Sequence, residues 1–316
     1  MRVLVIGAGA IGSVLAAGIS QGGGDVRLIA RGRRLDWLLH HPLEIVSDGQ
    51  VRHVAVTASD WSGLERPADL AILCTKTVDL AAALVDVAPC LAPGASIVTL
   101  QNGVEAPQMV VERLPASGVL AGRVHGFFTM EGQCVQHVGV APTIALGGAN
   151  ERGIKAEQEV CQLIAKAGFA CTVSSNIMRD LWEKLMLVAS LGAVAAALHI
   201  PAGRVGHTAE GATLLREALS EVARVARACG ISLGTTDIER VITFVRRFPR
   251  TATTSLQRDL NAGRPSEYDA LVGVILRLAQ SHGVAIPTFA QLDRELNART
   301  ATGSRGQDAA GKPWKA

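Results

Sequence analysis

A glycine-rich turn between an apolar strand and a helix constrains this chain more than any other feature. Residues 3–6 form a short apolar run, and residues 7–12, with the sequence GAGAIG, follow it directly. Residues 11–20 are rich in Ala and have helical spacing. A G-x-G-x-x-G pattern alone is common, but in this strand–turn–helix context it is typical of a dinucleotide-binding unit.

The residues of this turn have separable expected roles. Gly7 allows the tight turn, Gly9 lets the backbone approach a pyrophosphate, and Gly12 lets the helix pack close to the strand. Ala10 and Ile11 start the helix, where unpaired backbone N–H groups and the helix dipole favour phosphate. We therefore expect these five residues to bind a dinucleotide; the alternative is a glycine turn without a ligand.

The end of the second predicted strand, residues 26–29, favours NADP over NAD. An NAD site usually carries Asp or Glu here to bind the ribose 2′-hydroxyl. This chain has Arg31 instead, whose guanidinium suits a 2′-phosphate, and Lys76, after the third predicted strand, can add a second positive charge. We expect NADPH/NADP+ as the cofactor, and we interpret at least one of Arg33 and Arg34 as the solvated start of a helix.

The first half of the chain alternates strand and helix patterns. Apolar runs predict strands at residues 26–29, 70–74 and 96–100, and helical spacing covers residues 78–87. This rhythm predicts the α/β class, with an N-terminal Rossmann-type doubly wound sheet covered by helices on both faces. Further expected elements are a hairpin at 43–46 and 51–56, short strands within 118–148, a helix at 153–167 and a strand at 170–173.

Beyond residue 175 the pattern is almost wholly helical, which predicts a C-terminal all-helical domain. Apolar residues recur at spacings of three and four over residues 214–229, 238–247 and 268–282. We expect an NADP-binding domain at 1–175, a helical substrate and catalytic domain at 176–298, and a disordered tail at 299–316. The uncharged stretch 185–203 is Ala-rich and predicts a buried helix ending near Pro201 rather than a membrane span.

Composition excludes several classes of partner. Lys and Arg number 31 against 28 Asp and Glu, and aromatic residues make up 3%, which argues against nucleic acid and anionic membranes. The six cysteines have no zinc spacing and are expected to be reduced thiols in a cytoplasmic protein without a metal site. The N-terminal strand lacks the layout of a signal peptide. A small-molecule carbonyl substrate and a homodimer are the expected partners.

Short motifs follow the glycine turn in a fixed order. They are QNG at 101–103, WEKL at 182–185, SLQRD at 255–259, GRP at 263–265 and EYDAL at 267–271, then HGV and a proline at 282–287. Over residues 1–297 this set resembles the ketopantoate reductase (2-dehydropantoate 2-reductase) family. The resemblance implies NADPH-dependent reduction of a 2-oxo acid to a 2-hydroxy acid.

The resemblance also implies site residues. Lys184 would donate the proton to the new alkoxide, and apolar neighbours on its helix would favour proton release by desolvation; an ion pair with Asp180 is the alternative. Asn102 would lie near nicotinamide and substrate, or serve only as a turn residue. Glu267 would hydrogen-bond in the active site, or be an exposed carboxylate at a helix start. Ser255 would bind the substrate carboxylate.

Three positions depart from the family pattern. The family usually carries Asn four and eight residues after its lysine, where this chain has Val188 and Gly192, and Val272 replaces a third Asn. Spacings of four and eight lie on one helical face, so Val188 and Gly192 are expected to line the substrate pocket beside Lys184. Losing amides makes the pocket drier, which favours a 2-oxo acid more apolar than ketopantoate.

Two alternative functions stay open on the sequence. One is another two-domain NADP-dependent dehydrogenase of hydroxyacid, opine or imine type. The other is a non-catalytic NADPH-binding sensor, an alternative that the departures from the family pattern at Val188 and Gly192 leave open. His125, in a predicted strand, is an alternative acid, whereas His199 is expected to interact with free carbonyls at a helix end.

Overall fold

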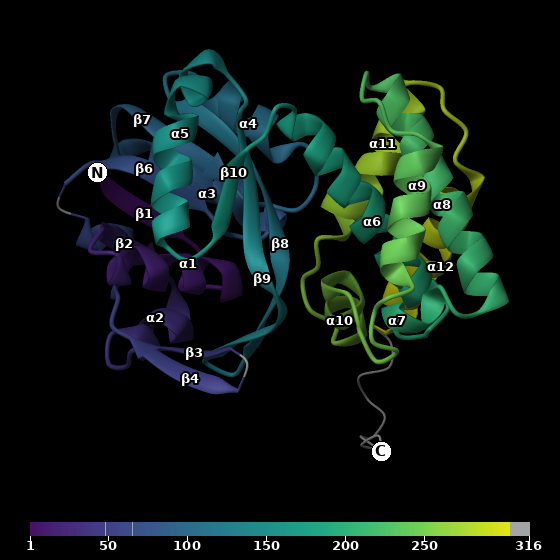
Figure 1. Ribbon diagram of the computed structural model, residues 1–316, viewed down its shortest axis with the longest axis horizontal. Helices are drawn as coiled ribbons and strands as arrows, with labels where there is room; N and C mark the ends of the chain where they lie inside the picture. Colours follow the sequence, from purple (N-terminus) through teal and green to yellow (C-terminus); the bar gives the residue numbers. More distant parts are fainter. Residues whose placement is uncertain (48, 65, 304–316) are drawn as a thin grey trace. The chain divides into compact units, whose positions relative to one another are not determined.

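The structure, a computed structural model, describes residues 1–47, 49–64 and 66–303. The chain divides into two compact units, Met1–Leu181 and a second that begins at Trp182 (Figure 1). The boundary expected near residue 175 falls between strand β10 (Ala170–Val173) and helix α6 (Ile177–Ala197). The roles of the two units as coenzyme and substrate domains remain predictions.

One sheet organises the first unit. Its ten strands within the described residues have the order β4-β3-β9-β8-β7-β6-β1-β2-β5, with β10 beside β9. The parallel strands on one side of the sheet are β1 (Arg2–Ile6), β2 (Asp25–Ile29), β5 (Thr57–Ser59), β6 (Ala68–Leu73) and β7 (Leu91–Thr99). The doubly wound Rossmann-type sheet is confirmed, and β5 is an edge strand that the sequence pattern did not reveal.

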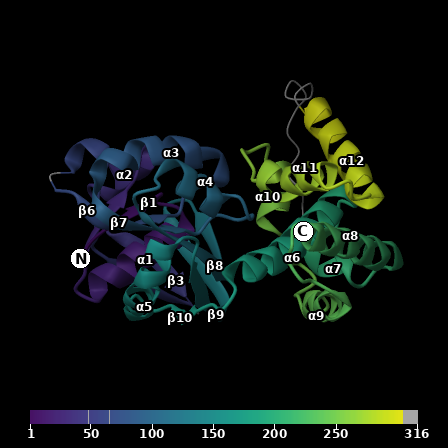
Figure 2. The same ribbon diagram turned by 90° about the horizontal axis from the view of Figure 1, so that it is seen from above.

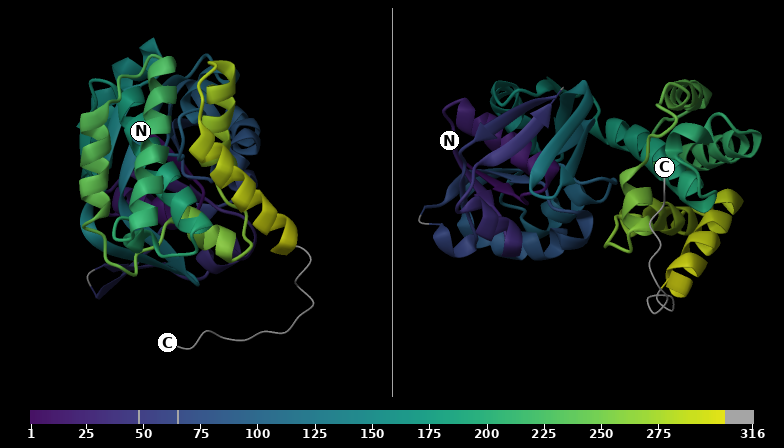
Figure 3. Two further views of the ribbon diagram at one scale, coloured as in Figure 1. Left: turned by 90° about the vertical axis from the view of Figure 1, so that its right-hand side faces the viewer. Right: turned by 90° about the horizontal axis from the view of Figure 1, so that it is seen from below.

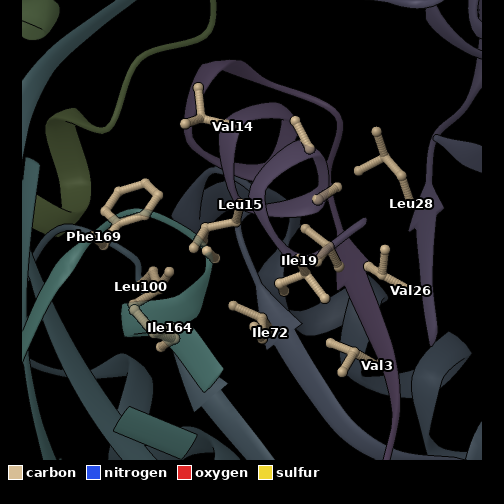
Figure 4. Close-up of a cluster of buried hydrophobic side chains, with 14 of the residues drawn as sticks. Val3, Val14, Leu15, Ile19, Val26, Leu28, Ile72, Leu100, Ile164 and Phe169 are labelled. Carbon is tan, nitrogen blue, oxygen red and sulfur yellow. The ribbon is translucent and has the colours of Figure 1, made fainter. Parts of the chain in front are cut away.

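Successive side chains along the central strands point to opposite faces of the sheet, and both faces are apolar. In β1, Val3 and Val5 face one core and Leu4 and Ile6 the other. Helices α1 (Ala10–Gln21) and α5 (Glu151–Lys166) cover the first face, and α3 (Leu80–Val87) and α4 (Ala106–Arg113) the second (Figure 2). The side chains of the first core interdigitate between α1 and the strands (Figure 4).

The region of residues 118–148 corrects one expectation. Instead of several short strands, it contains two long antiparallel ones, β8 (Gly118–Glu131) and β9 (Cys134–Gly148). The glycines do not end strands here: Gly126, with φ 149°, lies where the register shifts between His125 and Phe127, so it marks a bulge. The hairpin of β3 (Leu43–Ser47) and β4 (Gln50–Val54) is confirmed.

The second unit is helical throughout its described residues. After α6 come α7 (Ala202–Val205), α8 (Ala209–Ala228), α9 (Thr235–Val245), α10 (Ser255–Asn261), the π-helical turn η4 (Asp269–Gly273), α11 (Val274–Ser281) and α12 (Pro287–Gly303). Helix α12, yellow in Figure 3, packs on α8. The remaining short elements of the chain are α2 (Gly32–Leu38), η1 (Trp61–Gly63), η2 (Thr77–Asp79) and η3 (Ala88–Cys90).

The uncharged stretch that the sequence predicts to be helical forms the C-terminal part of α6, after Lys184. The helix ends at Ala197, and His199 takes a left-handed conformation with φ 55°. The N–H groups of His199 and Ile200 donate to the carbonyls of Ala196 and Ala195, which is a Schellman ending. No helix among the described residues is long and apolar enough to span a membrane.

Helix α12 corrects the expected start of the tail. The tail was expected from residue 299, but the helix continues to Gly303 because neither Gly nor Pro interrupts it before that residue. Residues 304–316 of the expected tail lie outside the described residues.

Candidate functional site

The carboxyl ends of four parallel strands meet beside the glycine turn. Ile6 pairs with Ile29 of β2 and Leu73 of β6, and Leu73 pairs with Thr99 of β7. Ligands of open α/β sheets bind at this edge. The first unit therefore gathers the turn, Arg31 and the segments that follow β6 and β7 at one edge of its sheet.

Packing within the protein explains two of the three glycines of the turn. Gly7 has φ 105°, and a Cβ on it would lie 2.9 Å from the Thr75 nitrogen. A Cβ on Gly12 would lie 2.0 Å from the carbonyl oxygen of Gly7, so α1 packs on the turn without space for a side chain. A Cβ on Gly9 would meet no protein atom within 4 Å. Packing within the protein therefore does not explain Gly9, and its role at a pyrophosphate stays a prediction.

The start of α1 is open to an anion. Gly9 is its N-cap and has no side chain to accept from the first-turn N–H groups, and that turn, which includes Ala10 and Ile11, has no acidic residue. The positive end of the helix dipole therefore lies at the turn without a neutralising carboxylate in that first turn. A pyrophosphate fits this arrangement.

Arg34 holds the glycine turn from the side. Its Nε donates to the carbonyl of Ala8 at 3.2 Å, and its Nη2 donates to the hydroxyl of Ser13 at 3.2 Å. Its Nη1 donates to the backbone carbonyl and the side-chain oxygen of Gln133 at 2.7 and 2.9 Å. Burial lowers the pKa of Arg34 from its ordinary value. Arg34 is thus a structural brace, whereas Arg33 is exposed, as expected for a helix start.

Arg31 lies on the surface at the end of β2. It is the N-cap of α2, its side chain is 82% exposed, and its Nη2 lies 2.8 Å from Oδ1 of Asp79. Asp79 ends η2, and Lys76 is the N-cap of the same short helix. Arg31 and Lys76 are the two cations that the sequence predicts at a 2′-phosphate. The ion pair between Arg31 and Asp79 connects the segments on which they lie.

The segment after β7 carries Gln101 and Asn102. Asn102 is half-buried, and its carbonyl oxygen accepts a hydrogen bond from the Thr77 hydroxyl at 3.4 Å. Gln101 is buried and donates to carbonyl oxygens at the end of β6. Sequence reasoning assigned no role to Gln101 because its partners are separated from it along the chain.

Cys74 lies between the glycine turn and these segments. Its Cβ would be 3.1 Å from a Cβ on Gly12. Burial raises the pKa of the Cys74 thiol to about 12. The thiol is therefore neutral near pH 7 and acts as an apolar packing group.

Lys184 stands near the start of the second unit, on α6. It is half-buried between fully buried neighbours such as Leu185 and Met186. Two acids near it on α6 have recorded contacts: Asp180 accepts from the Ser174 hydroxyl at 2.6 Å, and Glu183 lies 3.0 Å from Arg240. The residues that follow Lys184 on the helix, from Leu185 to Val188, are apolar.

Gly192 has a packing role that the sequence did not indicate. A Cβ there would lie 3.2 Å from Cδ2 of Leu256 and 3.5 Å from Oγ1 of Thr254. The start of α10 therefore lies against α6 at Gly192. Leu256 occupies the space beside Gly192, and Val188, one turn earlier, is half-buried; that both residues line the substrate pocket stays a prediction.

The packing of α10 against α6 at Gly192 also brings Ser255 next to α6. Ser255 is the first residue of α10 and is exposed, and Oγ1 of the N-cap Thr254 accepts from the Gln257 N–H at 3.1 Å. The Ser255 hydroxyl is therefore not needed to cap its helix. The Ser255 hydroxyl can therefore bind a ligand without loss of the helix cap.

Glu267 precedes the π-helical turn, and Val272 lies within it. The carbonyl of Glu267 accepts from the Leu271 N–H at 3.0 Å, and its side chain is half-buried. Val272 is 0% exposed, so it packs in an interior rather than lining solvent-accessible space. An ion pair between Asp269 and Arg277 at 2.5 Å crosses the turn, where a residue larger than Gly273 would clash.

The two alternative histidines differ in setting. His125 is half-buried on β8 opposite Thr143, beside the bulge. His199 is exposed at the end of α6, where its own backbone conformation terminates the helix. Among the described residues, no group of three or more His, Cys, Asp or Glu could hold a metal ion.

Comparison with known proteins matches both units to one family. The model of ketopantoate reductase PanE/ApbA matches residues 3–151, and that of its C-terminal region matches residues 176–300. A 2-dehydropantoate 2-reductase of Halobacterium salinarum is 28% identical over 298 residues, covering 92% of this chain and 96% of that protein.

Two solved structures are similar over almost the whole chain. A PanE/ApbA family ketopantoate reductase from Ralstonia eutropha has a TM-score of 0.87 and 28% identity, covering 96% of this chain and 100% of the other. D-mandelate dehydrogenase, in a ternary structure with NADH and anilino(oxo)acetate, has a TM-score of 0.87 and 22% identity, covering 96% and 99%. The second likeness concerns the fold alone.

Proposed function

The chain belongs to the ketopantoate reductase family, an oxidoreductase family, and on that premise we propose that it reduces the carbonyl of a 2-oxo acid to a 2-hydroxy acid with NADPH. The main support for a bound coenzyme is the difference between Gly9 and the other two glycines of the turn. Gly7 and Gly12 are required by packing, whereas the space beside Gly9 is open, so that a pyrophosphate can approach its backbone. Bound NADPH would supply the hydride.

The phosphate form of the coenzyme is proposed from the end of β2. Arg31 stands there in place of the carboxylate that would bind a free 2′-hydroxyl and repel a 2′-phosphate. Lys76 follows β6, which lies on the other side of β1, and adds a second cation. The residues present fit NADPH better than NADH.

The catalytic roles follow the chemistry of carbonyl reduction. The new alkoxide oxygen needs a proton, and the Nζ of Lys184, on a largely apolar stretch of α6, donates it. The amide of Asn102 holds the reacting groups in place, and the carboxylate of Glu267 orients substrate or lysine. The Ser255 hydroxyl binds the substrate carboxylate.

The substrate side chain is proposed to be more apolar than that of ketopantoate. Val188 offers no hydrogen bond where the family usually has an amide, and Leu256 occupies the space beside Gly192. A site that lacks polar partners cannot favour a polar side chain. Aromatic and branched 2-oxo acids are the substrates to test first.

Steady-state kinetics test this function. Ketopantoate, phenylglyoxylate and 4-methyl-2-oxopentanoate are compared with NADPH and with NADH, with and without added amines. We expect turnover with NADPH that is fastest with the apolar acids and does not need an amine. A clear preference for ketopantoate would reject the substrate class, and an amine requirement would favour an opine or imine dehydrogenase.

The Lys184→Ala variant separates catalysis from binding. We expect it to lose turnover by about a hundredfold or more while it binds NADPH as the parent does. NADPH binding without turnover of any carbonyl by the parent would favour the sensor. The homodimer stays a prediction, which light scattering tests.

A further inference from the structure

Gln101 spans the ends of two neighbouring strands. It lies just after β7 and is 5% exposed. Its Nε2 donates to the carbonyl oxygens of Leu73, at 3.1 Å, and of Thr75, at 3.2 Å. Its Oε1 is buried with no hydrogen-bond partner among the described residues. The side chain is thus placed by its two donor hydrogens.

The carbonyl groups that Gln101 holds belong to the segment behind the glycine turn. Leu73 is the last residue of β6, and its carbonyl also accepts the Leu100 N–H at 3.1 Å. Thr75 follows two residues later, and its nitrogen lies 2.9 Å from where a Cβ of Gly7 would be. Residues 74–76 are therefore enclosed between the glycine turn on one side and Gln101 on the other.

A second bond ties the same segment to the residue after Gln101. The hydroxyl of Thr77 donates to the carbonyl oxygen of Asn102 at 3.4 Å. Lys76 lies between Thr75 and Thr77, so both of its chain neighbours are attached to residues 101–102. The position of the Lys76 backbone is consequently set from the end of β7.

We propose that Gln101 is a positioning residue for coenzyme choice. By holding the Thr75 carbonyl it fixes the point from which Lys76 reaches the 2′-phosphate, and it thereby favours NADPH over NADH without contacting the coenzyme. This inference rests on the proposed function, because it assumes that Lys76 binds the 2′-phosphate.

Only a primary amide with the length of the glutamine side chain can donate to the carbonyl oxygens of both Leu73 and Thr75. Glutamate would place acceptors against two carbonyl oxygens, and methionine has nothing to donate. Asparagine keeps the amide but is one methylene shorter, so it cannot bridge both carbonyls from the same backbone position. Gln101→Met and the milder Gln101→Asn are therefore the informative variants, and the second serves if the first folds poorly.

The second unit contains a closely matched control. Gln257 is 4% exposed, and its Nε2 donates to the carbonyls of Ala195 and Ile200 at 3.3 and 2.7 Å. Its Oε1 also has no partner among the described residues. Gln257→Met removes the same kind of bond from an equally buried amide on α10, whose acceptors lie at the end of α6, remote in sequence from residues 74–76.

The experiment measures the dissociation constants of NADPH and NADH by fluorescence titration of the full-length protein. The parent, Gln101→Met, Gln101→Asn, Gln257→Met, Lys76→Ala and the double variant Gln101→Met/Lys76→Ala are compared, with a thermal melt for each. We expect Gln101→Met to lower the preference for NADPH by about tenfold, and Gln101→Asn by less. Gln257→Met should leave that ratio unchanged even if it lowers the melting temperature.

The double variant tests the route through Lys76. If Gln101 acts by placing Lys76, its loss changes the ratio little once Lys76 is already alanine, so the two effects are not additive. Additive effects, or equal weakening of both coenzymes by Gln101→Met, would overturn the inference while the proposed function stands. If the parent has no preference for NADPH, the proposed coenzyme is wrong and the inference falls with it.

Discussion

The Nε of Arg34 donates to the carbonyl oxygen of Ala8 at 3.2 Å, which joins the start of α2 to the centre of the glycine turn. The same guanidinium reaches Ser13 on α1 and Gln133 between β8 and β9. One cation therefore supports three elements around the turn. A guanidinium suits this place because its five donors lie in one rigid plane.

Arg34→Met tests this brace. This variant removes the guanidinium hydrogen bonds to the Ala8 carbonyl, the Ser13 hydroxyl and Gln133, so we expect the free energy of unfolding to fall by about 2 kcal/mol. NADPH affinity should fall as well, because the turn is no longer held. Urea unfolding and coenzyme titration measure the two effects. The exposed neighbour supplies the control: Arg33→Met should change stability by less than about 0.5 kcal/mol, and equal effects of the two variants would contradict the brace.

Gly12→Ala and Gly9→Ala should separate folding from binding. The new Cβ at residue 12 would lie 2.0 Å from the Gly7 carbonyl oxygen, and we expect this overpacking to destabilise the protein by about 1–3 kcal/mol. The Cβ at residue 9 meets nothing in the protein within 4 Å, so the melting temperature should stay near that of the parent while NADPH affinity falls. Unchanged affinity in Gly9→Ala would remove the main support for a coenzyme at this turn.

Asp79→Asn should strengthen NADPH binding. Asp79 lies 2.8 Å from the Arg31 guanidinium and presents a negative charge near the expected 2′-phosphate. Because the pair is exposed, we expect a gain of only about threefold at low salt, lost at high salt, with NADH binding unchanged. Asp86→Asn, an exposed position on α3, makes the same charge change and should have no effect on either coenzyme. Weaker NADPH binding in Asp79→Asn would mean that the ion pair itself positions Arg31.

Asparagine substitutions at the two family positions should differ in outcome. Val188→Asn places an amide at a half-buried position, and we expect kcat/KM for ketopantoate to rise about tenfold relative to phenylglyoxylate. Gly192→Asn instead meets Leu256, whose Cδ2 would be 3.2 Å from the new Cβ, so the chief effect should be lower stability. Competition assays and thermal melts distinguish the two. Improved ketopantoate turnover in Gly192→Asn at unchanged stability would show that α10 can move away from α6 without a loss of stability.

The thiol of Cys74 should be unreactive in the native protein. Burial raises its pKa to about 12, so its thiolate fraction at pH 8 is far lower than in the unfolded chain. Iodoacetamide labelling, followed by mass spectrometry of the Cys74 peptide, should be markedly slower in the folded protein. Equal rates with and without denaturant would refute the burial of this thiol.

The same group makes a pH-dependent contribution to stability. Its folded pKa is raised above the unfolded value, so folding favours the neutral thiol. This contribution is fully present below the unfolded pKa, near 9.0, and is lost as the pH rises toward 12. Cys74→Ala should therefore lose less stability than the parent between these pH values, measured by urea unfolding.

The sequence by itself determined the features that are local along the chain. The G-x-G-x-x-G turn, the alternation of apolar strand runs with helical patterns and the helical spacing beyond residue 175 predicted the α/β sheet and the helical second unit. These patterns connect residues that are close along the chain. The motifs around Asn102 and Lys184 likewise indicated the family without any knowledge of contacts.

Only the tertiary structure decided which residues support the site. It distinguished Gly9 from Gly12, made Arg34 a brace rather than a solvated residue, gave Gln101 its two carbonyl partners, and placed Leu256 against Gly192. Each of these roles depends on atoms that are distant along the chain and meet through the pairing of strands or the packing of helices. Periodicity carries no information about such pairs, because it records which face a residue occupies and not what that face meets.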